Sequence, residues 1–126
     1  MGAYLIIFIG AGIGGALRHG VNMAASRLGL AFPIGTLTVN VVGSLLMGLA
    51  AGYFLVRTGI DQHSRLFLTT GLLGGFTTFS AFSLDAALMF ERGQYWGLAN
   101  YLLGSVVLSI AALFLGLALV RFGMNG

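Results

Sequence analysis

The sequence has no cysteine and no lysine, and charged residues make up only 7% of its 126 residues. Without cysteine, neither a disulfide framework nor a thiolate metal site can form. Without lysine there is no Walker-type phosphate loop, and six singly scattered arginines form no nucleic-acid-binding patch. Soluble domains carry about 25% charged residues, so these few charges cannot cover a water-soluble globule. With 58% hydrophobic residues, the composition indicates an integral membrane protein.

Four apolar segments are long enough to cross a bilayer, because a helical span needs about 20 mostly apolar residues. They cover residues 2–26, 33–56, 66–90 and 95–120, with short polar connections between them. No soluble domain fits in those connections. We therefore predict an all-α membrane protein in which residues 1–126 form a single four-helix transmembrane domain, with both termini on the same side.

The arginines around these segments are balanced between the two sides of the predicted bundle. The side with the termini carries Arg57, Arg65 and Arg121, and the opposite side carries Arg18, Arg27 and Arg92. Arginine and lysine in short loops set the orientation of a membrane protein, so this balance predicts insertion in both orientations. The assembly that fits is an antiparallel, dual-topology homodimer, the two-chain equivalent of an inverted-repeat transporter. The alternative is a single orientation fixed by another factor.

The third segment mixes glycines, hydroxyl residues and phenylalanines within an uncharged apolar run, residues 69–83 (TTGLLGGFTTFSAFS). Irregular backbone at membrane depth survives only where protein buries it or where it lines an aqueous path. We expect the helix to break where Gly74-Gly75 precedes Thr77-Thr78, and mid-membrane breaks are typical ion sites. Carbonyls freed there can coordinate a small cation without a carboxylate. In the alternative, the glycines serve close packing and the threonines bond back to an intact helix.

The first segment contains a GxGxxG pattern at residues 10–15 (GAGIGG). A dinucleotide site needs a strand–turn–helix context and an acidic residue about 20 positions later, whereas the first acid here is Asp61. Close helix packing through small residues is therefore the better interpretation. Asp85 and Glu91 are expected near a helix end, and no intramembrane cluster of acids or histidines points to metal chemistry or to catalysis.

Three further features suit either packing or an anion path. Asn40 is either interhelical glue, worth about 1 kcal/mol, or a hydrogen-bond donor in a pore. Phe79 and Phe82 share a helix face; they are either apolar anchors or rings whose electropositive edges line a path for a small anion. Arg18 either attracts anions at a vestibule or anchors the chain at the headgroups.

The fourth segment carries a hydroxyl stripe, because Tyr101, Ser105 and Ser109 recur every four residues. Small-residue packing explains the serines, and the interfacial aromatic belt explains the tyrosine. The same stripe also describes a wall of hydrogen-bond donors along which an anion sheds its water.

Motifs along nearly the whole chain resemble the Fluc fluoride channels of bacterial membranes. They are GAGIGGALR at 10–18, GTLTVNVVGS at 35–44, the 69–83 segment and ERG at 91–93. The resemblance implies dual-topology homodimers of four-span subunits in the inner membrane, with two antiparallel pores and a central structural sodium ion. It also implies a passive, fluoride-selective channel that exports cytoplasmic fluoride and confers fluoride resistance.

Carried over by motif, the resemblance assigns the sodium ligands to the backbone carbonyls of Gly74 and Thr77 from both subunits. It also implies that Phe79 and Phe82 are the aromatic pair of the pore and that Asn40 is the pore amide. Tyr101, Ser105 and Ser109 would form the polar track, Ser80 would be a pore hydroxyl and Arg18 the vestibule arginine. The family commonly has threonine where this chain has Ala81, so one hydroxyl near the pore is lost.

Two other functions compete with the channel. A small multidrug-type, proton-coupled exporter has this size and topology, but it needs an acid in the first span, and residues 2–17 contain none. An accessory membrane subunit would use the glycines for helix packing only. The prediction is a channel rather than an enzyme, with fluoride, a second copy of the chain and the lipid bilayer as partners and no nucleic acid.

Overall fold

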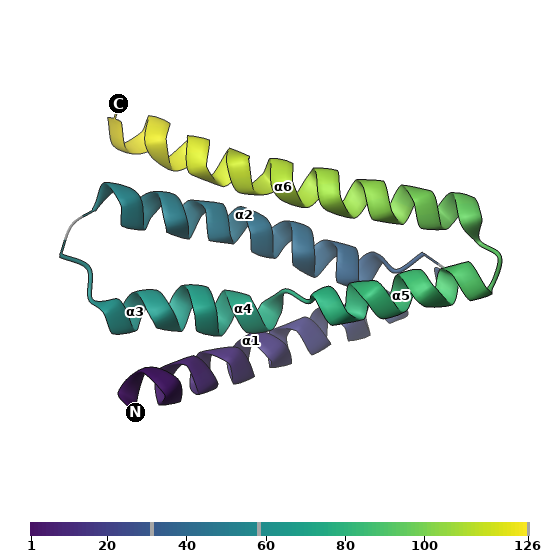
Figure 1. The fold of residues 1–126 in the computed structure, drawn as a ribbon, viewed down its shortest axis with the longest axis horizontal. Helices are drawn as coiled ribbons and strands as arrows, with labels where there is room; N and C mark the ends of the chain where they lie inside the picture. The colour runs from purple at the N-terminus through teal and green to yellow at the C-terminus, as the bar shows by residue number, and fades with distance from the viewer. Residues whose placement is uncertain (31, 58, 126) are drawn as a thin grey trace.

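The computed structural model describes residues 1–30, 32–57 and 59–125 of the chain, and these form helices and short connections (Figure 1). The first two spans are α1 (Gly2–Ser26) and α2 (Ile34–Val56). The fourth span, α6, runs from Tyr95 to Asn125, beyond the predicted end at residue 120. All four expected spans are long and apolar enough to cross a membrane. Ala31, Thr58 and Gly126 of the predicted 1–126 domain lie outside the described residues.

The third span is divided into four consecutive pieces. It begins with α3 (Gln62–Leu66), continues through the π-helical segment η1 (Phe67–Leu73) and the single turn α4 (Gly74–Phe76), and resumes as α5 (Phe79–Glu91). Figure 1 shows the gap between α4 and α5 near the middle of the molecule. α2 packs along α6, while α1 packs on η1 and α4. Both termini lie at the end of the molecule that also holds the α2–α3 connection (Figure 1).

The break predicted in the third span is confirmed, and it lies at the two threonines. Thr77 (φ −84°, ψ 157°) and Thr78 (φ −152°, ψ 120°) have extended backbone. Gly74 and Gly75, which were expected to share the break, remain helical in α4. Thr78 then opens α5 as its N-cap, since its Oγ1 accepts from the Ala81 N–H at 3.1 Å. An N-cap threonine supplies a partner for one free N–H of the new helix.

The glycines before the break allow α1 to approach the third span closely. A Cβ on Gly14 would collide with the Leu72 carbonyl oxygen and come within 2.8 Å of the Phe76 nitrogen. A Cβ on Gly75 would collide with the Ala11 carbonyl oxygen and lie 2.8 Å from its Cα. The GAGIGG pattern therefore serves helix packing, as its sequence context indicated. In lipid, such close backbone contact replaces the hydrophobic effect as the force between helices.

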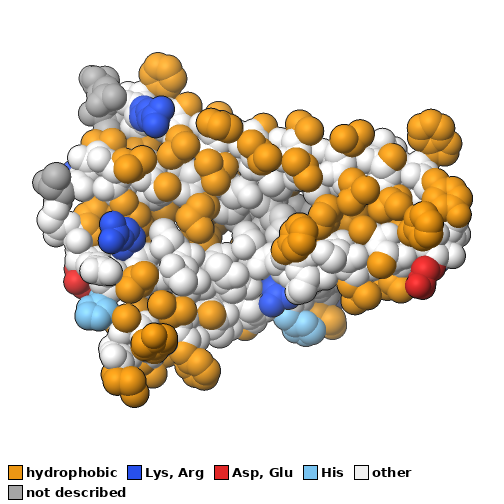
Figure 2. All heavy atoms as spheres, in the orientation of Figure 1, with side chains coloured by type: hydrophobic (Ala, Val, Ile, Leu, Met, Phe, Trp, Pro, Cys, Tyr) orange, Lys and Arg blue, Asp and Glu red, His pale blue; other side chains and the backbone are white. Residues whose placement is uncertain are grey.

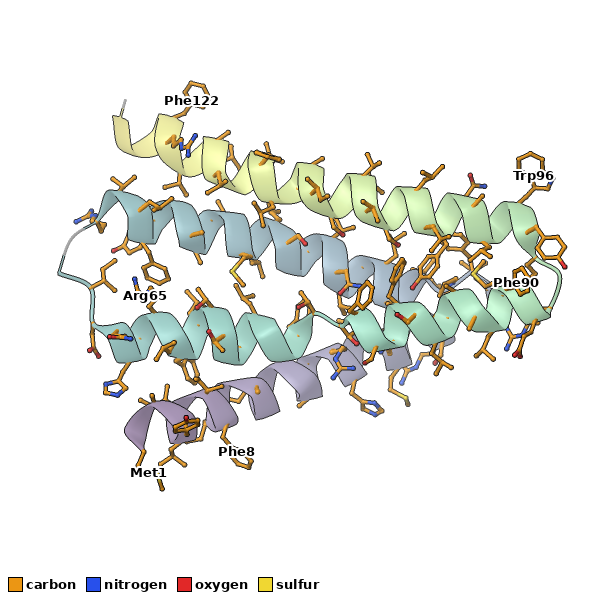
Figure 3. The ribbon with its side chains drawn as sticks, viewed as in Figure 1. Met1, Phe8, Arg65, Phe90, Trp96 and Phe122 are labelled. Atoms are coloured by element: carbon orange, nitrogen blue, oxygen red, sulfur yellow. The ribbon has the colours of Figure 1, made fainter. Side chains whose placement is uncertain are left out.

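The outer surface is apolar, as a bilayer requires. Figure 2 shows apolar side chains spread along the depicted face from end to end, and Figure 3 shows Phe8, Trp96 and Phe122 pointing away from the bundle. Their exposed fractions are 76%, 86% and 80%. Aromatic residues near both ends of the spans suit the membrane–water interface.

The arginines are less evenly divided than the sequence predicted. Arg57, Arg65 and Arg121 lie at the end of the molecule that holds the termini. Arg27 and Arg92, the C-cap residues of α1 and α5, lie at the opposite end. Arg18 lies inside α1 and contacts the α4 turn rather than flanking a span. Three arginines therefore flank the spans at the end with the termini and two at the opposite end, where the sequence predicted three at each.

A test of the α1 packing compares two glycines of the same helix. Gly14→Ala places a methyl group against the backbone of the third span, and overpacking of this kind costs about 1–3 kcal/mol. Gly12→Ala is the control, because nothing lies within 4 Å of its Cβ position and alanine favours a helix by up to about 1 kcal/mol. Thermal unfolding of the detergent-solubilised protein should show a lower midpoint for Gly14→Ala only. Equal midpoints for the two variants would contradict the packing described here.

Candidate functional site

A cavity of about 360 Å³ opens beside the break, between α2, α5 and α6. Figure 2 shows a hollow near the middle of the molecule on the side it depicts. The polar residues that line the cavity are Asn40, Ser44, Thr77, Thr78, Ser105 and Ser109. Phe79 and Phe82 lie at the same cavity, and its remaining lining is apolar or glycine. No lining residue is charged among the described residues, so any ion that enters meets hydroxyl groups, one amide, aromatic rings and apolar side chains.

Asn40 on α2 fixes the backbone at the break. Its Nδ2 donates to the Thr78 carbonyl oxygen at 3.0 Å, and its Oδ1 accepts from the Thr78 N–H at 2.8 Å. The side-chain amide therefore pairs with the backbone much as a neighbouring β-strand would. The sequence left open whether Asn40 joins helices or faces a pore; it joins α2 to the third span and also lines the cavity.

The Gly74 and Thr77 carbonyls lose the donors that a continuous helix would give them. The Thr78 N–H, which would reach the Gly74 oxygen in an α-helix, goes instead to Asn40. The Ala81 N–H, which would reach the Thr77 oxygen, goes to the Thr78 hydroxyl at 3.1 Å. These two predicted ligand carbonyls are therefore freed by specific competing bonds.

Threonine back-bonding, which the sequence left open as the alternative to a break, is also present at Thr77. The Thr77 Oγ1 and the Thr77 N–H both donate to the Leu73 carbonyl oxygen, each at 3.0 Å. Gly43 of α2 makes room for this arrangement, since a Cβ there would collide with Thr77 Cγ2. The Thr77 hydroxyl is thus turned back on its own helix, and its carbonyl oxygen is left for other partners.

The aromatic pair Phe79 and Phe82, which the spacing places on one helix face, lies at the cavity. The Phe79 and Phe82 ring centroids are 5.7 Å apart with an interplanar angle of 44°. Phe82 also packs on Tyr101, at 5.0 Å between centroids. Phe79 is 78% exposed in the single chain. An aromatic ring so exposed at the level of a mid-span break indicates a surface that a further protein chain or lipid covers.

The hydroxyl stripe of α6 is divided between two environments. Ser105 and Ser109 line the cavity, and the Ser105 Oγ is buried without a hydrogen-bond partner among the described residues. Tyr101 is fully buried and outside the cavity lining, with its hydroxyl donating to Asp85 Oδ2 at 3.2 Å. Buried polar atoms usually have a hydrogen-bond partner, so the Ser105 hydroxyl differs from the Tyr101 hydroxyl in having none among the described residues.

Besides Tyr101, three of the predicted site residues do not line the cavity. Gly74 lies in the α4 turn with its backbone exposed, and Ser80 is exposed, with its Oγ 3.3 Å from Thr78 Oγ1. Arg18 donates from Nε to the Gly75 carbonyl oxygen at 3.2 Å. The structure thus gathers the cavity residues Asn40, Thr77, Phe79, Phe82, Ser105 and Ser109 at one place and leaves the others outside its lining.

The sequence did not identify Ser44 or the partner of Tyr101. Ser44 lies one helical turn after Asn40 and opens to the same cavity, a spacing that the helix period could have revealed. Asp85 was expected near a helix end, but it lies within α5 and holds the Tyr101 hydroxyl. Asp85 also lines a second cavity of about 300 Å³, together with Thr36 and Ala81. Ala81, the position at which one hydroxyl is lost, therefore lines this second cavity and not the cavity beside the break.

The chain matches known proteins over nearly all of its length. Residues 5–117 match the CrcB-like protein family, described as camphor resistance (CrcB). A relative from Methylobacterium nodulans is 60% identical over 93% of this chain and 94% of its own. One from Rhodopseudomonas palustris is 60% identical over 94% and 96%, and one from Granulibacter bethesdensis is 55% identical over 100% of both. Each of these relatives bears the name fluoride-specific ion channel FluC.

The four spans and these bacterial relatives identify a multi-pass membrane protein of bacteria. The relatives are named as ion channels, a class distinct from enzymes. The resemblance drawn from the motifs and the match over residues 5–117 agree, and the chain belongs to the CrcB-like family.

Proposed function

We propose that this chain forms a fluoride-specific ion channel that lets cytoplasmic fluoride leave the cell passively and so confers fluoride resistance. The observation that carries the proposal is the uncharged cavity beside the broken third span, with its hydroxyls, amide and aromatic pair. The names of relatives at 55–60% identity over almost the whole chain support it. Hydrogen fluoride enters as a neutral acid and dissociates inside, so a channel drains the trapped anion down its electrochemical gradient.

The chemistry of the cavity suits a small, strongly hydrated anion. Hydroxyl groups such as that of Ser105, which has no partner among the described residues, can replace water as hydrogen-bond donors. Ring edges are electropositive, so Phe79 and Phe82 add stabilisation without a formal charge. Conduction requires binding strong enough for entry and weak enough for exit. Neutral donors satisfy both conditions better than a fixed cation in the lining would.

The proposal includes an antiparallel, dual-topology homodimer. In the single chain, Phe79 is 78% exposed and the Gly74 backbone is exposed, although both lie where the span is broken. Irregular backbone at membrane depth must be buried in protein or face water. A second copy related by a two-fold axis in the membrane plane would cover the break with its own break. Flanking arginines that differ by a single residue between the two ends suit insertion both ways.

A sodium ion at the two-fold axis fits the donor set. Gly74 and Thr77 each present a carbonyl whose helical donor is engaged elsewhere, and unwound carbonyls are typical sodium ligands in membrane proteins. Two copies would supply these carbonyls twice. No group of three or more acidic, histidine or cysteine residues could hold a metal within the described residues. A cation at this place would therefore be held by backbone oxygens and would join the subunits.

The first test is anion efflux from liposomes that contain the purified protein. Fluoride should leave rapidly and chloride much more slowly, because the hydrogen-bond donors of the cavity suit the smaller anion. Replacing sodium by a large organic cation on both sides should reduce fluoride efflux. Comparable fluoride and chloride fluxes would contradict the proposed fluoride channel. Fluoride-selective flux that does not depend on sodium would contradict only the proposed sodium site.

Ser105→Ala separates a functional hydroxyl from a structural one. The variant removes a buried oxygen that has no partner, and an unsatisfied buried group costs about 1–3 kcal/mol. Thermal stability should therefore stay constant or rise, while fluoride flux falls. Ser83→Ala is the matched control, because Ser83 is exposed on α5 and its loss should change neither quantity. A Ser105→Ala protein with wild-type flux would show that this hydroxyl contacts no permeating ion.

Orientation can be measured with one engineered thiol, because the chain has no cysteine of its own. Ser64→Cys places it on an exposed residue of α3, at the end that holds the termini. In an antiparallel dimer about half of these thiols face each side of the membrane. A membrane-impermeant maleimide should therefore label about half of them in intact cells and the rest after permeabilisation. Labelling of all or none before permeabilisation would exclude dual topology.

A further inference from the structure

Arg18 of α1 donates a hydrogen bond to the backbone beside the break, although the two residues are far apart in the sequence. Its Nε lies 3.2 Å from the Gly75 carbonyl oxygen, a contact that spans 57 positions of sequence. The contact is partly buried. Gly14, one turn earlier on α1, brings the helix against Leu72 and Phe76, and this close approach places the arginine within reach of the α4 turn.

The bond to Arg18 replaces one that the break removes. In a continuous helix the Gly75 oxygen would accept from the Phe79 N–H, but Thr77 and Thr78 are extended and separate α4 from α5. An unpaired carbonyl at membrane depth is costly. The Arg18 guanidinium supplies a substitute donor at 3.2 Å.

The break is thus held from two helices. Asn40 of α2 binds both backbone groups of Thr78, and Arg18 of α1 binds Gly75 on the other side of Thr77. With these two points fixed, the free Gly74 and Thr77 carbonyls keep one arrangement. We infer that Arg18 is a positioning residue: through its Nε–H it holds the α4 side of the break, and so it sets the geometry of the carbonyls that meet at the centre of the assembly.

This inference rests on the proposed channel, and it differs from an arginine that only attracts anions at a vestibule. Attraction needs the charge of the side chain, whereas positioning needs the donor at the Nε position. Glutamine places a neutral N–H₂ group the same number of bonds from Cβ as arginine Nε. Methionine has similar length without a donor, and lysine keeps the charge.

The experiment compares Arg18→Gln, Arg18→Met and Arg18→Lys in liposomes. It measures the dimeric fraction of the purified protein, maximal fluoride flux, the fluoride concentration for half-maximal flux at two ionic strengths, and the sodium concentration that supports flux. We expect Arg18→Gln to retain the wild-type sodium requirement and most of the maximal flux. Arg18→Met should need roughly tenfold more sodium, the change in equilibrium that one such hydrogen bond produces. Arg27→Gln and Arg27→Met, at the exposed end of α1, are controls and should match each other.

Rescue by glutamine decides the result. If Arg18→Gln assembles and conducts while Arg18→Met loses flux or fails to assemble, the positioning role is supported. If glutamine and methionine behave alike and only lysine retains flux, with a difference that salt screens, Arg18 acts by charge and the inference is wrong. Wild-type flux without any sodium dependence counts against the sodium proposal alone, and the Arg18 variants are then judged on maximal flux and assembly.

Discussion

The pairing of Asn40 with Thr78 is the interaction on which the site depends. A bilayer offers no water to an interrupted helix, so each backbone group freed by a break must find a partner in the protein. One side-chain amide supplies a donor and an acceptor to the same residue, at 3.0 and 2.8 Å. By taking the Thr78 N–H, it also withdraws the donor of the Gly74 carbonyl. The same pairing that stabilises the break therefore frees the Gly74 oxygen, while the bond from the Ala81 N–H to the Thr78 hydroxyl frees that of Thr77.

Close packing of α1 complements this pairing from the opposite side. Gly14 and Gly75 allow the backbones of α1 and α4 to touch, and the π-helical turns of η1 lie along the same contact. Segments of π-helix are rare and are frequently found at functional sites. Here the contact fixes α4 against a long, regular helix, while α5 packs separately on α6. The two halves of the third span are thus attached to different helices, and the break is where those attachments change.

Much of this arrangement could be predicted from the sequence, because composition and helix period report on whole spans. The four helices, the break in residues 69–83, the packing role of GAGIGG and the cavity positions of Ser105 and Ser109 follow from such patterns. The position of the break at Thr77 and Thr78, after the glycines, depends on a partner from α2. The Arg18–Gly75 and Tyr101–Asp85 contacts likewise join distant parts of the chain. No local pattern encodes them, since each requires a specific approach of two helices.

The distribution of charge around the break bears on how an anion channel remains selective without trapping its ion. Arg18, which contacts the break, directs its Nε to a carbonyl, while the described cavity lining is uncharged. A guanidinium inside the cavity would bind a small anion strongly and slow its departure. An arginine that instead holds the backbone contributes a positive potential at a distance, which attracts anions while leaving hydroxyls and ring edges to contact them. One arginine can then both hold the backbone of the break and attract anions, provided that the passage itself is lined by neutral donors.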